Sequence, residues 1–338
     1  MDLRSATVDV RPVLAAYALE APLTLFGLPQ QGANNTMYGV RSAAGSFVLK
    51  RFDAADDGAR LDYEHRLLGW LGARTLPFAV PVPRAARDGR TLVDYDQQRY
   101  ALYPWLPGRQ SDEHNLTQLR AFGAALGELH QVLVAYPCDR VPGLWRYDQL
   151  EHLHALVPDP YGLTPAAIGL APGPAVDALC AWWRGELTRL RPFIEQRYPA
   201  LPRQVIHGDY DPSNTLYDGA RLTAILDFEF ASPDARAMDL AAGLHWTLRP
   251  VQATLDWPAA AAVLGGYTSV VALGGAEAEA LPELMRLRNV ATGIWWLGRH
   301  QRTGMAAQRV ERLAWTRSWN TVIEQHRATL VALAAHAP

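Results

Sequence analysis

Short runs of alternating apolar and polar residues fill the first hundred positions, and this pattern is typical of strands. The predicted strands cover residues 37–42, 46–52, 90–96 and 98–105. The first two are joined by a short turn that ends at Gly45. A helix is predicted over 59–74, where leucines recur at helical spacing with charges between them, and a short opening helix over 8–19.

From about residue 110 the apolar spacing becomes helical. Helices are predicted over 116–133, 175–198, 282–302 and 310–335. A non-helical island at 204–230 interrupts them, and within it strands 215–218 and 221–228 flank an Asp-Gly turn. The sequence therefore predicts an α+β protein of two lobes with a cleft between them. The N-terminal lobe, 1–106, has a small antiparallel sheet and one helix, and the C-terminal lobe, 107–338, is mainly helical.

Composition excludes several classes of protein. A net charge of −2 gives no sign of a nucleic-acid partner, and no apolar run is long enough for a membrane span. Cys138 and Cys180 are the only cysteines, so neither a disulfide framework nor a zinc site is expected. The charged N-terminus is not that of a signal peptide. We expect a soluble cytoplasmic enzyme, either a monomer or a homodimer.

Lys50 is the only lysine in the chain, since the other 31 of the 32 basic residues are arginine. Lysine carries a compact point charge on a thin stem, whereas arginine carries a wide planar fork. A tight anionic site accepts the first and refuses the second. Two interpretations of Lys50 follow from this segment alone: a leftover surface lysine, or a ligand for such a site.

The island 204–230 contains most of the candidate catalytic and metal-binding residues. HGDYDPSN places Asp209 five residues before Asn214, and Asp227 and Glu229 follow the second strand. Oxygen ligands on short connections suit a hard cation such as Mg²⁺, which keeps waters and phosphate oxygens. An Asp, then an Asn, then a second Asp after a hairpin is the spacing of the phosphoryl-transfer apparatus of kinases.

These motifs resemble those of the aminoglycoside phosphotransferase and choline kinase group, which has the protein-kinase-like fold. HGDYDPSN and LDFE resemble its catalytic loop and metal motif, and FVLKRF resembles the strand that carries its phosphate-binding lysine. Further similar segments are YEHRLLGWL, with Glu64, and YALYPWLPG, with Tyr103 and Trp105 at the hinge. MDLAAGL resembles the helix whose aspartate, here Asp239, would brace the catalytic loop. The resemblance runs from about residue 27 to residue 300.

The resemblance implies a role for each residue. Lys50, held by Glu64, would reach the α- and β-phosphates of ATP, which explains why one ammonium group was kept. Asp209 would accept the proton of the attacking hydroxyl, with His207 supporting the loop. Asn214 and Asp227 would hold Mg²⁺, with Glu229 as a further metal or water ligand. Asn35 and Thr36, in QQGANNTMY at 30–38, would contact the nucleotide beside a backbone that covers the phosphates.

The acceptor is a small molecule with a hydroxyl group, and several classes are open. Segments 29–52 and 264–300 are most similar to the type II homoserine kinases, which implies a homoserine-like amino alcohol, with Arg288 and Arg299 as candidate cations for its carboxylate. Aminoglycosides, choline and ethanolamine are the alternatives. Residues 110–338 carry 19 basic and 23 acidic groups. This small excess of acidic groups gives little support for a polycationic aminoglycoside as the acceptor.

A nucleotide-binding pseudokinase scaffold is the competing class. Against it, Lys50, Glu64, Asp209, Asn214 and Asp227 are all present. A protein kinase is a third alternative, and the chain has no activation segment ending in APE. The tryptophan pairs 182–183 and 295–296 lie on helical patterns and are predicted to be core rather than substrate contacts.

Overall fold

The computed structural model describes residues 9–28, 35–52, 58–112, 114–139, 143–248, 250–251 and 254–337. The chain forms two compact units: Met1–Gly108 with Thr223–Glu229, and Arg109–Leu222 with Phe230–Pro338. The division does not follow the linear sequence, because the segment that carries Asp227 and Glu229 belongs with the N-terminal residues. The antiparallel sheet of the first unit and the helices of the second confirm the α+β class predicted from the sequence.

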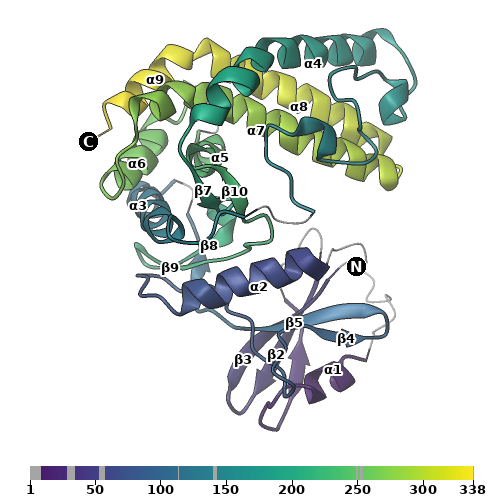
Figure 1. The fold of residues 1–338 in the computed structure, drawn as a ribbon, viewed down its shortest axis with the longest axis vertical. Helices are drawn as coiled ribbons and strands as arrows, with labels where there is room; N and C mark the ends of the chain where they lie inside the picture. Colours follow the sequence, from purple (N-terminus) through teal and green to yellow (C-terminus); the bar gives the residue numbers. More distant parts are fainter. Residues whose placement is uncertain are drawn as a thin grey trace. The chain divides into compact units, whose positions relative to one another are not determined.

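An antiparallel sheet forms the core of the N-terminal unit, with strand order β1-β2-β3-β5-β4 (Figure 1). Its strands are β1 (Thr24–Phe26), β2 (Thr36–Ser42), β3 (Gly45–Arg51), β4 (Val93–Tyr95) and β5 (Gln98–Pro104). The predicted hairpin of β2 and β3 is confirmed, and its register sets Lys50 opposite Met37. On the other side of β3, Lys50 pairs with Ala101 of β5. Lys50 is therefore on a central strand of the sheet.

Successive side chains of a strand point to opposite faces of the sheet, so the two faces of this sheet make different contacts. Leu49 and Leu102 point to the face covered by α1 (Arg11–Ala15), where they pack with Val13 in one apolar cluster. Lys50, one residue on, therefore points to the opposite face, as Tyr103 does. Tyr103 bonds there to a histidine of α2 (Gly58–Gly72). The helix α1 is shorter than predicted, since the Ala16 carbonyl accepts from the Arg87 N–H instead of from its own helix.

Seven helices are described in the C-terminal unit. They are α3 (Leu116–Leu133), α4 (Pro174–Pro192), α5 (Ala237–Thr247), α6 (Trp257–Thr268), α7 (Gly275–Arg302), α8 (Ala306–Gln325) and α9 (Arg327–Ala335). The helix predicted over 116–133 is confirmed. The helix predicted to continue to residue 198 is regular only to Pro192, which has no N–H for the ladder, and a π turn follows. The predicted helix 310–335 is divided at His326.

Close backbone packing holds α3 against α6 (Figure 1). A Cβ atom at Gly123 would collide with the Val263 carbonyl, and one at Gly266 with the Arg120 carbonyl. Beside this pair, α5 is buried along its length apart from Trp246, and α7 packs against it. The space between α3 and α6 therefore tolerates only glycine at these two crossings.

Short strands connect the helices and position the polar loops. They are β6 (Arg109–Gln110), β7 (Arg203–Ile206), β8 (Thr215–Asp218), β9 (Arg221–Ile225), β10 (Ser232–Ala235), β11 (Pro250–Val251) and β12 (Thr254–Leu255). β7 pairs with β10, and the HGD motif begins where β7 ends. β9 follows β8 through the predicted turn, where Gly219 has a φ of +61°.

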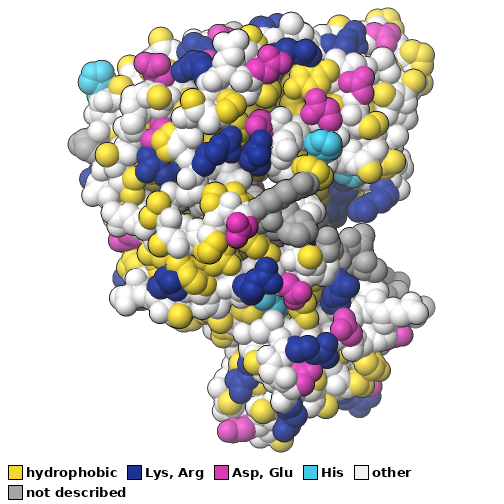
Figure 2. Space-filling view, in the orientation of Figure 1, with side chains coloured by type: hydrophobic (Ala, Val, Ile, Leu, Met, Phe, Trp, Pro, Cys, Tyr) yellow, Lys and Arg dark blue, Asp and Glu magenta, His cyan; other side chains and the backbone are white. Residues whose placement is uncertain are grey.

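The described helices include none with the length and apolarity needed to cross a membrane. The face of the molecule in Figure 2 intersperses basic and acidic side chains. The polar groups with the clearest chemistry are instead partly or fully buried, around Lys50 in the N-terminal unit and around Asp209 in the C-terminal unit.

Candidate active site

Glu229 is the carboxylate that anchors Lys50. The Lys50 Nζ atom lies 3.3 Å from Oε2 of Glu229 and 3.7 Å from Oδ1 of Asp227. The same Glu229 oxygen accepts a hydrogen bond of 3.1 Å from Nδ2 of Asn35. Glu229 is only 5% exposed. The end of the DFE motif therefore links β3 to the residue that precedes β2.

Electrostatics keep Lys50 charged. Burial by itself would lower the pKa of Lys50, but Asp227, Glu229 and Glu64 outweigh it, so the pKa is well above its usual value. A charged ammonium group is the form of lysine that makes charge-assisted hydrogen bonds to phosphate oxygens.

Glu64 is not the ion-pair partner that the resemblance implied. The ion pairs described for Lys50 are with Asp227 and Glu229, and one Glu64 oxygen is buried without a hydrogen bond in the described part of the chain. Burial raises the pKa of Glu64 to about 7, and the charge of Lys50 opposes this rise. Glu64 interacts with Lys50 as a nearby charge on α2 rather than as a direct contact.

Asp227 and Glu229 have different surroundings, although both were predicted as metal ligands. The Asp227 side chain is 44% exposed, and its backbone has a φ of +62°, an uncommon conformation for a residue with a side chain. One oxygen of buried Glu229 is already engaged by Lys50 and Asn35. An open carboxylate on a constrained backbone suits a cation better than a buried one that holds two side chains.

The other predicted nucleotide contacts are placed as follows. The Tyr103 hydroxyl is buried 2.9 Å from Nε2 of His65, whose pKa is lowered to about 4 by burial and by the charge of Lys50. Thr36 accepts a hydrogen bond of 3.0 Å from Arg51. Trp105 is exposed on the N-terminal unit. Within the predicted phosphate-covering segment, residues 30–34 lie outside the described part of the chain.

Asp239 on α5 fixes the loop that carries Asp209. Its carboxylate accepts backbone hydrogen bonds of 2.7 Å from His207 and 2.8 Å from Gly208. His130 of α3 lies 3.2 Å from the same carboxylate. Gly208 has a φ of +83°, and a Cβ atom there would collide with the Phe230 carbonyl. The bracing role that the sequence predicted for Asp239 is confirmed.

Asp209 projects from this braced loop and is 38% exposed. Its backbone N–H donates to Nδ1 of His207 at 3.3 Å, which fits a supporting role for that buried histidine. Its carbonyl accepts a hydrogen bond of 3.0 Å from Nδ2 of Asn214. The amide nitrogen of Asn214 is thus engaged by the loop, and its Oδ1 atom is the one suited to a cation.

Two contacts on this loop come from residues distant in sequence. Arg288 of α7 donates from Nη2 to Oδ1 of Asp209 at 2.7 Å. The Tyr147 hydroxyl donates to the Gly208 carbonyl at 2.5 Å, and Asp234 accepts from the Tyr147 backbone N–H at 3.0 Å. The sequence marked Arg288 only as a candidate for the acceptor's carboxylate and gave no signal for Tyr147, because neither belongs to a local motif.

The donor set of the motif fits Mg²⁺ by its chemistry. Asn214 offers an amide oxygen in the C-terminal unit and Asp227 an exposed carboxylate in the N-terminal unit, and each is a donor type that Mg²⁺ accepts beside waters and phosphates. Within the described ranges, no three His, Cys, Asp or Glu side chains cluster as a metal site. A cage made only of protein groups is therefore not found in this part of the chain.

The chain has a small antiparallel sheet that carries one lysine, followed by a helical unit with a braced HGD loop. These features are typical of the protein-kinase-like phosphotransferases. The chain belongs to the phosphotransferase enzyme family, whose model matches residues 28–272. It is therefore a small-molecule kinase that acts on an alcohol group.

Individual relatives agree with this assignment. A homoserine kinase of Acidiphilium cryptum is 30% identical over 257 residues, which cover 76% of this chain and 75% of the relative. The fold is similar to that of a microcompartment-associated aminopropanol kinase, with a TM-score of 0.69, 18% identity and coverage of 95% and 97% of the two chains. It is also similar to an amicoumacin kinase in complex with AMP-PNP and Ca²⁺, with a TM-score of 0.68, 17% identity and 91% coverage of each chain.

Proposed function

We propose that this protein transfers the γ-phosphate of ATP, with Mg²⁺, to the hydroxyl of a small amino alcohol that resembles homoserine. The observation that carries the proposal is the braced, partly exposed Asp209 beside a buried arginine, in a chain similar to homoserine kinases. ATP and a divalent cation are supported by the nucleotide analogue and the Ca²⁺ bound to the amicoumacin kinase of similar fold.

In this reaction the chain's own groups position and neutralise charge. Lys50 holds the α- and β-phosphates, with Glu229 fixing its stem. Asp209 accepts the hydrogen bond of the acceptor hydroxyl, whose oxygen bonds to the γ-phosphorus as the bond to the β-phosphate oxygen breaks. The hydroxyl proton passes to Asp209, and ADP leaves. Mg²⁺ would be held by Asn214 and Asp227 and would supply neutralisation of the phosphate charge.

A panel of acceptors tests this proposal. ADP release is measured with Mg²⁺-ATP and, in turn, L-homoserine, choline, ethanolamine, hydroxylysine, methylthioribose and aminoglycosides. We expect one strong acceptor, L-homoserine or a close analogue, and loss of its turnover in Asp209→Ala. Turnover that persists in Asp209→Ala would contradict the assignment of Asp209 as the base. A strong preference for another class of acceptor would contradict the assignment of a homoserine-like substrate.

A choline-like acceptor is the second candidate. Three tryptophans surround His245 in the C-terminal unit, with ring centroids 5.5 Å away for Trp246, 5.1 Å for Trp315 and 4.9 Å for Trp319. Aromatic faces attract quaternary ammonium groups. Choline turnover that falls on replacement of Trp319 by leucine would favour this candidate over the amino acid.

A further inference from the structure

Arg288 is a buried cation that does not use all of its hydrogen-bond donors. Its side chain is 4% exposed, one Nη atom bonds to Asp209, and its Nε has no hydrogen-bond partner in the described residues. An unpaired buried donor on a charged group is costly. The carboxylate that pairs with Arg288 belongs to the residue assigned as the base, so the ion pair engages one of the two oxygens that could accept a hydrogen bond from an acceptor hydroxyl.

A second arginine, Arg312, is on α8, which packs against the helix α7 that carries Arg288. Burial, reinforced by the positive charge of Arg288, lowers the pKa of Arg312 to about 10. The Arg312 guanidinium carbon lies 4.7 Å from the ring centroid of Trp315 and 5.4 Å from that of Trp296. Among the described residues, no carboxylate lies within ion-pair distance of its guanidinium. The charge of Arg288 therefore acts on Arg312, and the carboxylates that act on Arg288 are its ion-pair partner Asp209 and the more distant Asp211.

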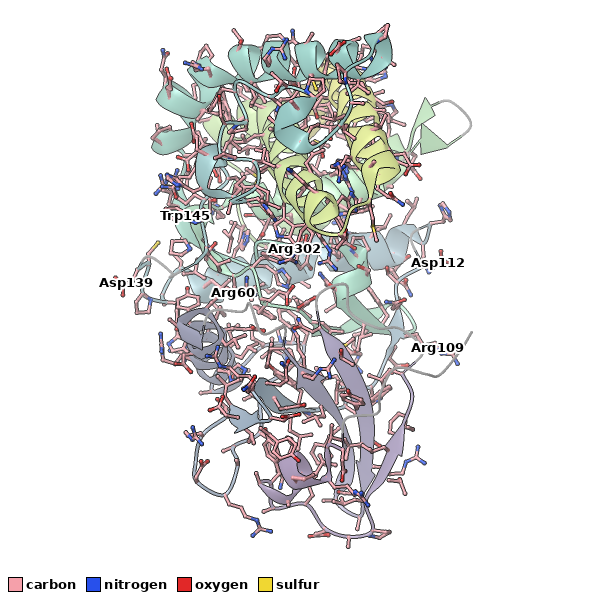
Figure 3. All side chains as sticks on the ribbon, turned by 90° about the vertical axis from the view of Figure 1, so that its right-hand side faces the viewer. Arg60, Arg109, Asp112, Asp139, Trp145 and Arg302 are labelled. Atoms are coloured by element: carbon pink, nitrogen blue, oxygen red, sulfur yellow. The ribbon has the colours of Figure 1, made fainter. Side chains whose placement is uncertain are left out.

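A third arginine, Arg299 of α7, also lies beside tryptophan rings. The Arg299 guanidinium carbon lies 5.2 Å from the ring centroid of Trp295 and 5.5 Å from that of Trp296. These two tryptophans are only half-buried, unlike fully buried Trp183, so the prediction that both pairs are core holds for Trp183 alone. Figure 3 shows α7 in yellow-green and the later α8 in yellow, with Arg302, the last residue of α7, labelled.

We propose that Arg288 and Arg312 bind the carboxylate of the acceptor, and that this carboxylate replaces Asp209 as the partner of Arg288. A planar carboxylate offers two oxygens to two guanidinium groups, and it uses the donor capacity that the free protein leaves unpaired. Asp209 is then released to accept the hydroxyl hydrogen bond. The inference rests on the proposed function and adds the recognition group and its link to the base.

The consequence is discrimination through turnover as well as through binding. An amino alcohol without a carboxylate leaves Arg288 on Asp209, so the base stays engaged even when the hydroxyl is bound. The transfer itself is unchanged: the hydroxyl oxygen bonds to the γ-phosphorus, ADP leaves, and the proton goes to the freed Asp209. Arg288 is a positioning residue in this scheme, and Arg312 a specificity-determining one.

The test compares L-homoserine with 3-amino-1-propanol, which has the same chain without the carboxylate. For the wild type, kcat/KM should favour L-homoserine by roughly a hundredfold, the range expected for hydrogen bonds to a charged group. Arg312→Gln should raise KM for L-homoserine by about tenfold or more, and leave kcat/KM for 3-amino-1-propanol and KM for ATP unchanged. Arg288→Lys should lower kcat for L-homoserine more than it raises KM.

Arg317→Gln is the matched control, because Arg317 is exposed on the same helix. Thermal unfolding of each variant checks folding. Equal use of the two acceptors by the wild type, or equal effects of Arg312→Gln on both, would overturn the inference while leaving the kinase proposal in place. If neither acceptor is turned over, calorimetric binding of L-homoserine decides: binding weakened in Arg312→Gln but not in Arg317→Gln supports recognition, and unchanged binding overturns it.

Discussion

Lys50, the only lysine in the chain, is joined to Glu229 by an ion pair of 3.3 Å that spans 179 positions of the sequence. The same carboxylate oxygen also holds Asn35. Glu229, two positions after the predicted metal ligand Asp227, thus anchors Lys50, the lysine that we propose to bind phosphate. Asp227 is left as the exposed carboxylate of this group.

Replacing Lys50 by arginine should abolish efficient phosphoryl transfer despite the conserved charge. The site around Lys50 is filled by Glu229, Asp227 and Asn35, and a planar fork needs more room than an ammonium group. We expect Lys50→Arg and Lys50→Met to lower kcat/KM for ATP by about a hundredfold to a thousandfold. Steady-state ADP release measures it. Arg41→Lys, on exposed Arg41 of β2, is the control, and near-normal activity of Lys50→Arg would disprove the steric argument.

Replacing each of the two acidic residues of the DFE motif should have a different effect. Asp227→Asn should raise the Mg²⁺ concentration for half-maximal rate by about tenfold or more, as expected for loss of a metal ligand. Glu229→Gln should instead lower the free energy of unfolding by about 3 kcal/mol, because it breaks a buried ion pair. Mg²⁺ titrations and urea unfolding of both variants distinguish the roles. A Mg²⁺ shift in Glu229→Gln equal to that in Asp227→Asn would restore Glu229 as a ligand.

Asp239→Asn should loosen the loop that carries Asp209. An asparagine is uncharged and keeps only one acceptor oxygen, so one of the two backbone N–H groups, at His207 or Gly208, loses its acceptor. The free energy of unfolding should fall by about 2 kcal/mol, and kcat should fall with it. Denaturant unfolding and steady-state kinetics measure the two effects. Asp218→Asn, at an exposed position in the β8–β9 turn, should change neither.

Stability should fall with rising pH because of Glu64. Its pKa is about 7 in the folded protein against about 4.5 in the unfolded chain. Unfolding therefore releases a proton between these values, and the free energy of unfolding should fall by about 1.4 kcal/mol per pH unit across that window and level off above pH 7. Glu64→Gln should remove this slope in urea unfolding measured from pH 5 to 8. An identical slope in the variant would contradict the assignment.

Gly123→Ala should destabilise the protein although alanine is the better helix former. The new methyl group would collide with the Val263 carbonyl on α6, so α3 and α6 would have to separate, at about 1–3 kcal/mol. Gly69→Ala in α2 is the matched control: nothing lies near its Cβ position, and it should stabilise by about 0.5–1 kcal/mol. Thermal unfolding of both variants gives the comparison, and a stable Gly123→Ala protein would mean that the helices can move apart cheaply.

The sequence alone determined what is local in this protein. Apolar periodicity located the β2–β3 hairpin and the helix α3, because side-chain alternation and helical spacing are fixed by backbone geometry. The HGD motif and the resemblance around it identified the kinase class and the bracing aspartate, Asp239, because that chemistry needs a few residues at set intervals. The predicted helix ends were wrong where Pro192 interrupts the hydrogen-bond ladder and where the Ala16 carbonyl accepts from the distant Arg87 N–H.

Only the tertiary structure decided which partners the charged groups take. Lys50 pairs with Glu229 rather than with Glu64, and Asp209 pairs with Arg288, which is 79 positions away. Neither pair has a sequence interval that marks it, because ion pairs between separate elements depend on where the backbone brings side chains together and on which of them lose their water. Burial and proximity are properties of the packed chain, and they set both the charge of Lys50 and the partner of Asp209.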